Sequence, residues 1–194
     1  MMKTTVVSLA AVAFGSSLSP AADWAEWGGS ATKNMVSPVT NLPTDFSPGE
    51  GQSEEEIANS ATHLRWVAKL GSQTYGTPTI GAGKVLVGTN NEEPRNEAIK
   101  GDRGVVMCFD EKTGAYQWQL TTPKLGAGKV SDWEFLGMCS SALIDAENNA
   151  GYVVTNRGEV VAFDLDGLAN GNDGEFQLEG KYMAGGLDGL DTAT

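Results

Sequence analysis

A short stretch near the middle of the chain constrains its fold most strongly. Residues 105–109 are apolar and prone to form a β-strand, and Asp110 and Gly114 follow at positions that suit a tight turn. Tyr116 and Trp118 then lie on one face of an outgoing strand, because side chains repeat with period two along a strand. The stretch therefore predicts a β-hairpin.

This hairpin sequence recurs later in the chain. Residues 103–110 read Arg-Gly-Val-Val-Met-Cys-Phe-Asp, and residues 157–164 read Arg-Gly-Glu-Val-Val-Ala-Phe-Asp. Residues 84–90 likewise resemble residues 151–156, so the agreement extends over several consecutive strands. A repeat of roughly fifty residues has the period of propeller blades rather than of helix-pair solenoids.

Strand patterns fill most of the two copies. Leu64, Trp66, Ala68 and Leu70 alternate on one face of a half-buried strand at residues 63–70. The 25 glycines and the scarcity of helix-period runs favour an all-β class. We therefore predict β-propeller blades of four antiparallel strands. Further strands are expected at residues 75–80, 84–89, 104–110, 115–120, 136–145, 151–155 and 158–165.

Five residues of the hairpin resemble the signature of a known family. The pattern Ala/Cys-x-Asp-x-x-Thr-Gly-x-x-x-Trp is present as Cys108, Asp110, Thr113, Gly114 and Trp118. It is similar to the tryptophan-docking motif of the pyrroloquinoline-quinone (PQQ) repeat β-propellers, the quinoprotein alcohol dehydrogenase-like family. In that family the indole packs against the neighbouring blade's motif and ties successive blades together.

The resemblance extends over about residues 63–165, and Trp66 occupies the place that Trp118 holds one unit later. In the second copy, Asp166-Gly167-Leu168 replaces the Thr-Gly step and no tryptophan follows. A full propeller of the family is similar to an eight-bladed ring, whereas this chain has strands for about two blades and part of a third. Two unclosed blades leave bare edge strands. We therefore expect an N-terminal fragment of a longer protein, whose partners are the remaining blades of the same propeller.

Three segments are predicted along the chain. Residues 1–22 combine Lys3, an apolar run and a small-residue region, which is the layout of a secretory signal peptide. A buried N-terminal helix or a membrane anchor is the alternative, but the apolar run is too short to span a bilayer. Residues 23–60 are an irregular N-terminal arm, in which the glutamates at 54–56 predict a solvated helix turn. Residues 61–194 form the partial PQQ-like propeller, and the protein is expected to be exported to the periplasm or the extracellular space.

The acidic composition bears on the partners. A formal net charge of -12 repels phosphate backbones and anionic lipids, so neither a nucleic-acid partner nor a membrane-surface role is expected. No long apolar segment follows the leader, and no membrane span is predicted. The one histidine, His63, begins a predicted strand and gives little support to a histidine-based triad or metal centre.

The two cysteines do not make a disulfide framework. Cys108 and Cys139 each sit inside an apolar, β-like run, where a small buried thiol is the usual explanation. Export makes a bridge between them permissible, but nothing in the sequence brings the two strands within reach. Two buried thiols are favoured over a disulfide.

The resemblance implies that ligands bind at the mouth of the propeller channel, on loops that join strands and blades. For a planar anionic quinone, Trp133 offers a stacking face, and Arg103 or Arg157 offers a guanidinium fork. Asparagine, aspartate and glutamate oxygens suit a calcium ion. The alternative is an ordinary wet loop surface, and an arginine present in both copies is more simply explained by blade architecture. The candidate cofactor-binding residues are Tyr75, Asn90, Arg103, Asp132, Trp133, Glu134, Asn156 and Arg157.

Two functions remain open at this point. The first is part of a quinoprotein dehydrogenase that oxidises alcohols or sugars, with PQQ and calcium as cofactors and a small-molecule substrate. The second is a non-catalytic propeller scaffold for binding a protein partner or for assembly in the periplasm or cell envelope, because fold does not fix function. The sequence contains no complete cofactor shell and assigns no catalytic residue.

Overall fold

A computed structural model describes residues 23–40, 42–125 and 133–183. The chain forms antiparallel β-sheets of four and three strands, with little helix. The leader predicted at residues 1–22 lies outside the described residues, so the structure does not test it.

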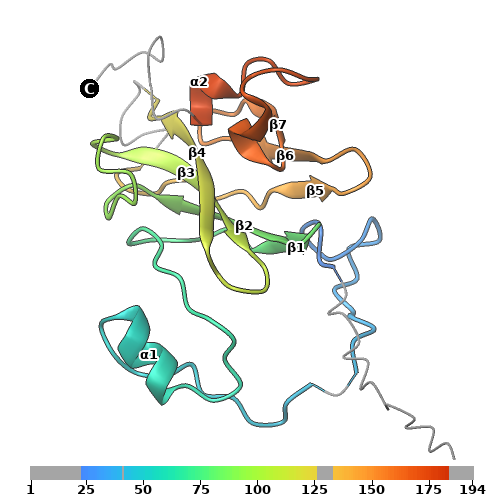
Figure 1. The fold of residues 1–194 in the computed structure, drawn as a ribbon, viewed down its shortest axis with the longest axis vertical. Helices are drawn as coiled ribbons and strands as arrows, with labels where there is room; N and C mark the ends of the chain where they lie inside the picture. The colour runs from blue at the N-terminus through green and yellow to red at the C-terminus, as the bar shows by residue number, and fades with distance from the viewer. Residues whose placement is uncertain (1–22, 41, 126–132, 184–194) are drawn as a thin grey trace, which may run out of the picture.

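The first sheet is the predicted four-stranded unit. Its strands are β1 (Thr79–Gly81), β2 (Lys84–Asn90), β3 (Arg103–Asp110) and β4 (Tyr116–Pro123). They pair antiparallel in chain order, as Figure 1 shows in green and yellow. Asp110 forms the predicted turn between β3 and β4, because its carboxylate accepts the backbone N–H groups of Lys112 and Thr113 at 3.1 and 2.8 Å.

The second sheet repeats the first three strands. It consists of β5 (Leu143–Asp145), β6 (Ala150–Val154) and β7 (Val160–Asp164), again in antiparallel chain order. The register confirms the internal repeat, because Val85 pairs with Phe109 in the first sheet as Gly151 pairs with Phe163 in the second. No fourth strand pairs with β7 among the described residues.

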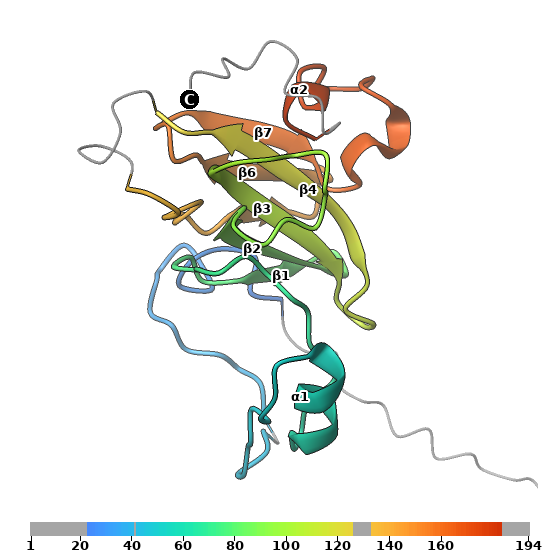
Figure 2. The same cartoon turned by 90° about the vertical axis from the view of Figure 1, so that its left-hand side faces the viewer.

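The two sheets stack with a shared core, and Figure 2 shows them lying one against the other. Alternate residues of β3 point to opposite faces of the first sheet. Val106 and Cys108 pack with Ile144, Val153 and Phe163 of the second sheet. The other face of β3, with β2, carries a second buried cluster that Trp66, Ala68, Leu70 and Ile80 cover: Val85, Val87, Val105, Met107 and Phe109. The first sheet is thus covered on both faces.

Three strand predictions need correction. Residues 63–70 form no strand in the described structure, because the segment lies across a face of the first sheet instead of pairing with a strand. Trp66, Ala68 and Leu70 nevertheless face the core, as expected. The strand expected at 75–80 is reduced to β1, since Pro78 has no N–H to donate to a ladder. The strand expected at 136–145 is reduced to β5, because Gly137 has a φ of 70°, outside the extended region.

The glutamates of the arm begin a helix, as predicted. Helix α1 (Glu54–Ser60) lies apart from both sheets in Figures 1 and 2. Ser53 caps its N-terminus, because its hydroxyl accepts the N–H of Glu56 at 3.2 Å. After β7 follow a 3-10 helix, η2 (Gly167–Asn170), and a short helix, α2 (Gly180–Met183).

Two tryptophans dock in the same way on successive sheets. Trp66 Nε1 donates to the Glu111 carbonyl at 2.8 Å, and the indole packs on Phe109 with ring centroids 6.2 Å apart. Trp118 Nε1 donates to the Leu165 carbonyl at 3.0 Å, and its indole packs edge-on against Phe163 at 5.5 Å. The acceptor is in each case the residue after the repeated aspartate, so the docking role predicted for Trp118 is confirmed.

A glycine lies beneath each docked indole. Gly114 and Gly167 have φ values of 72° and 61°, and a Cβ on either would come within 2.5 and 2.7 Å of the tryptophan ring. The second copy therefore keeps the docking surface although it lacks the Thr-Gly sequence.

One of the two cysteines is buried as predicted, and the other is not. Cys108 is fully buried and unbridged, whereas Cys139 is exposed, and no disulfide joins the two. The expectation of a second buried thiol was wrong because Cys139 lies in a loop two residues after the Gly137 turn rather than in a strand.

Candidate functional site

Asn90 is a structural residue at the end of β2. Its side chain is completely buried, and its Oδ1 accepts the N–H groups of Ser72 and Glu92 at 3.0 and 3.2 Å. Its Nδ2 donates to the Ser72 hydroxyl at 2.9 Å and to the Phe135 carbonyl at 2.6 Å. The carboxamide thus joins three backbone segments, which leaves its oxygen poorly placed to bind a metal ion.

Asn156 holds the equivalent position after β6. Its Nδ2 donates to the Pro123 carbonyl at 3.1 Å, and its Oδ1 accepts the Thr122 hydroxyl at 2.5 Å. Both contacts reach the end of β4 in the preceding sheet. Asn156 therefore links the second sheet to the first.

The two repeated arginines both bind backbone carbonyls. Arg157 Nη1 donates to the Lys124 carbonyl at 3.1 Å, and its Nε lies 3.4 Å from a Glu159 carboxylate oxygen. Arg103 Nη1 donates to the Asp102 carbonyl at 2.8 Å. These contacts agree with the architectural explanation of the repeated Arg-Gly pair.

A partly buried ion pair lies beside Arg103. Asp102 Oδ2 accepts the Phe135 N–H at 2.6 Å and lies 3.6 Å from Lys124 Nζ, which also donates to the Trp133 carbonyl. Arg103 Nε has no hydrogen-bond partner among the described residues. The contacts of Asp102 and Lys124 hold the loop that carries Trp133 against the ends of β3 and β4.

The remaining candidates are scattered. Tyr75 is 62% exposed, and its hydroxyl donates to the Gln73 carboxamide at 2.9 Å. Trp133 is 65% exposed, and Glu134 is exposed beside it. Asp132 lies outside the described residues, so the predicted Asp132-Trp133-Glu134 cluster is only partly described.

Several of the candidates bind backbone segments, and their side chains do not form one converging set. Asn90 and the Asp102–Lys124 pair contact the loop at 133–135, while Asn156 and Arg157 contact residues 122–124. Within the described ranges, no group of three or more His, Cys, Asp or Glu side chains is placed to hold a metal ion.

The buried thiol is chemically quiet. Burial raises the pKa of Cys108 to about 12, so the thiolate does not form near neutral pH. In contrast, hydrogen bonds from Thr113 lower the pKa of the exposed Asp110 carboxyl, which stays ionised in the turn. Neither group has the properties of a nucleophile or a general base.

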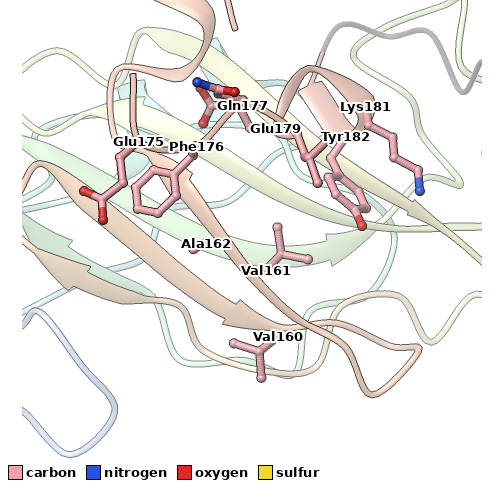
Figure 3. Close-up of a pocket in the computed structure, with 10 residues that line it drawn as sticks. Val160, Val161, Ala162, Glu175, Phe176, Gln177, Glu179, Lys181 and Tyr182 are labelled. Atoms are coloured by element: carbon pink, nitrogen blue, oxygen red, sulfur yellow. The ribbon is translucent and has the colours of Figure 1, made fainter. Parts of the chain in front are cut away.

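A pocket at the far end of the chain was not predicted from the sequence. It has a volume of about 480 Å³ and lies along β7, where Phe176 and Tyr182 cover Val161 and Ala162 (Figure 3). Its wall includes Glu179, a carboxylate with only 1% of its surface exposed. No periodic pattern singles out this glutamate, because it follows a glycine-rich stretch without strand or helix signals. None of the predicted site residues lines the pocket.

The fold and these contacts define a mostly β protein with repeated antiparallel sheets. No protein-family model matches the chain, and no curated protein matches it. Among solved structures, a quinohemoprotein alcohol dehydrogenase from Comamonas testosteroni matches part of it, with 24% identity and a TM-score of 0.30. The match covers 47% of this chain and 18% of that chain.

The helical segments of the described residues are α1, η2 and α2. None of them is both long enough and apolar enough to cross a bilayer.

Proposed function

We propose that this chain is part of an exported PQQ-like β-propeller and that it serves as a non-catalytic scaffold for binding or assembly. The observation that carries the proposal is the repeated docking of an indole on successive sheets. Trp66 and Trp118 each donate a hydrogen bond to the backbone carbonyl of the residue after the repeated aspartate. Each indole also packs over a glycine with a positive φ. Contacts of this kind would link successive sheets in series, as the blades of a propeller are linked.

The open side of the second sheet supports further blades as partners. Its outer face carries exposed apolar side chains, with Leu143, Val154 and Val160 at 39%, 48% and 72% exposure. In the first sheet, the Asp110 N–H donates to the Ala115 carbonyl, at the start of the fourth strand. In the second sheet, the equivalent Asp164 N–H donates to the Glu179 carboxylate instead. A side chain thus occupies the place of a strand, and β7 is left as an edge.

The scaffold is favoured over the dehydrogenase by the state of the candidate ligands. The oxygens of Asn90 and Asn156 already accept hydrogen bonds, and Arg157 is engaged with a carbonyl and a carboxylate. The described residues therefore do not fit the shell that a quinone with calcium requires. Among the described residues, the exposed Trp133 favours a planar ligand, but the Arg103 guanidinium donates to the Asp102 carbonyl.

The two functions are separated by titration of the full chain with PQQ in the presence of calcium. A scaffold predicts no change in the absorbance of the quinone and no change in the melting temperature of the protein. Saturable shifts in both, lost in Trp133→Ala, would contradict the scaffold and favour the dehydrogenase. Trp27→Ala is a suitable control, because Trp27 is also an exposed tryptophan and is not among the candidate cofactor-binding residues.

The fragment proposal has its own test in the concentration dependence of thermal unfolding. Because β7 is an open edge and the outer face of the second sheet is apolar, we expect the chain to self-associate and its transition to depend on concentration. A sharp transition that is independent of protein concentration would contradict the need for further blades.

A further inference from the structure

Two carboxylates meet where β7 ends. Glu179 is 1% exposed, and its Oε2 accepts the Asp164 N–H at 2.6 Å. Its second oxygen, Oε1, is buried and has no hydrogen-bond partner among the described residues. A buried carboxylate oxygen without a partner is costly, so a proton or a ligand at Oε1 would stabilise this site.

The Asp164 carboxyl is a charged neighbour of Glu179. Burial raises the pKa of Glu179, and the charge of Asp164 and its hydrogen bonding with Glu179 raise it further. No lysine or arginine in the described part of the chain forms an ion pair with Asp164 or Glu179. The pair must therefore be neutralised either by a proton or by a cation.

Neutral oxygen and amide groups lie beside the Asp164 carboxylate. Asn170 Nδ2 donates to Asp164 Oδ2 at 2.8 Å and to the Asp173 carbonyl at 2.8 Å. Gly174 packs close to both side chains, since a Cβ there would lie 3.0 Å from Asn170 Nδ2 and 3.8 Å from Asp164 Oδ2. The surroundings thus contain a hard oxygen donor, the Asp173 carbonyl, beside the Asp164 carboxylate.

The first sheet shows that the pair is not required by the repeat. There the equivalent Asp110 carboxylate is satisfied by the N–H groups of Lys112 and Thr113 and by the Thr113 hydroxyl at 2.7 Å. The Asp110 N–H donates to the Ala115 carbonyl, which holds the place that the Glu179 carboxylate takes in the second sheet. The second copy has therefore acquired an extra anionic oxygen at this point.

We propose that Asp164 and Glu179 together bind one calcium ion at the end of β7. Calcium accepts oxygen ligands in irregular number and geometry and commonly completes its shell with carbonyls and waters, which suits two carboxylates beside the Asp173 carbonyl. Binding would neutralise the buried pair and fix the segment of residues 174–183 along the β7 edge. The proposal does not rest on the proposed function.

Isothermal titration of the chelator-treated full chain with calcium chloride tests it. The expected result is one site, a rise in melting temperature with calcium, and an affinity at least tenfold weaker in Glu179→Gln and in Asp164→Asn. Both substitutions keep the shape of the side chain, and circular dichroism verifies folding. Glu175→Gln is the matched control, because Glu175 is an exposed carboxylate of the same segment, and its affinity should be unchanged.

Two results would overturn the calcium site. The first is a wild-type chain that gives no binding heat and no calcium-dependent shift in melting temperature, which decides the matter whether or not the variants fold. The second is unchanged calcium affinity in a folded Glu179→Gln chain. A pair that shares a proton instead would give a melting temperature that depends on pH and not on calcium, and that outcome also rejects the site.

Discussion

The two docked tryptophans make the same hydrogen bond but belong to different parts of the fold. Trp66 belongs to a segment outside any strand and covers one face of the first sheet, while Trp118 belongs to β4 and reaches the second sheet. Each places Nε1 on the carbonyl after the repeated aspartate. The shared hydrogen bond therefore forms whether or not the tryptophan lies in a strand.

The receiving surfaces also differ in sequence. Gly114 follows the predicted turn directly, whereas Gly167 lies at the start of η2, and both hold a positive φ below the indole. The comparison shows that the glycine and the carbonyl are common to both copies, whereas the threonine of the signature is present only in the first.

Removal of either indole is expected to have the largest effect. Trp118→Ala and Trp66→Ala should each lower the free energy of unfolding by about 3 kcal/mol, because a large, partly buried ring and its hydrogen bond are lost together. Chemical denaturation measures both. Trp27→Ala is the control, since Trp27 is 53% exposed and should cost little. A loss well below about 1 kcal/mol for Trp118→Ala would show that it does not dock.

A methyl group beneath each indole should have the next largest effect. Gly114→Ala and Gly167→Ala are expected to destabilise by about 2 kcal/mol each, since a strained φ is combined with a clash against the ring. Gly158 also has a positive φ, of 75°, but a Cβ there meets nothing within 4 Å. Gly158→Ala should therefore cost only about 1 kcal/mol, the price of the backbone alone. Equal losses at all three glycines would remove the indole from the explanation.

The smallest effect is expected at an ion pair between the sheets. Lys84 of β2 lies 3.0 Å from Asp166, just after β7, and lowers the pKa of that carboxyl. Lys84→Met should cost about 0.5 kcal/mol near neutral pH, because Asp166 is largely exposed. A lowered pKa stabilises the fold above the ordinary pKa of aspartate, and this contribution is lost as pH falls through the lowered value. Denaturation between pH 6 and pH 2, at roughly constant salt, should therefore show a smaller loss in Lys84→Met than in the wild type.

The repeat was predictable because its residues fix backbone geometry. The strands β2, β3, β6 and β7 follow the apolar runs that the two copies share, and the Asp110 turn follows from side-chain chemistry. Residues 63–70 were predicted as a strand because alternation reports only which side chains face a core. It does not report whether the backbone has a ladder partner.

The candidate site was less predictable. Asn90, Asn156, Arg103 and Arg157 were chosen for their chemistry. The contacts of Asn90, Asn156 and Arg157 reach distant carbonyls and depend on how the chain folds, whereas Arg103 contacts the neighbouring Asp102 carbonyl. Glu179 carries no pattern in the sequence, and only the fold brings it to the β7 edge. Buried polar contacts between segments far apart in the chain are beyond periodicity and turn chemistry.

Amide hydrogen exchange in Trp118→Ala and Trp66→Ala tests most directly whether each indole holds the sheet that receives it. In Trp118→Ala, protection should fall mainly in β6 and β7, including Val153, Val161 and Phe163. In Trp66→Ala, it should fall mainly in β2 and β3. Equal loss of protection across both sheets in both variants would contradict the account.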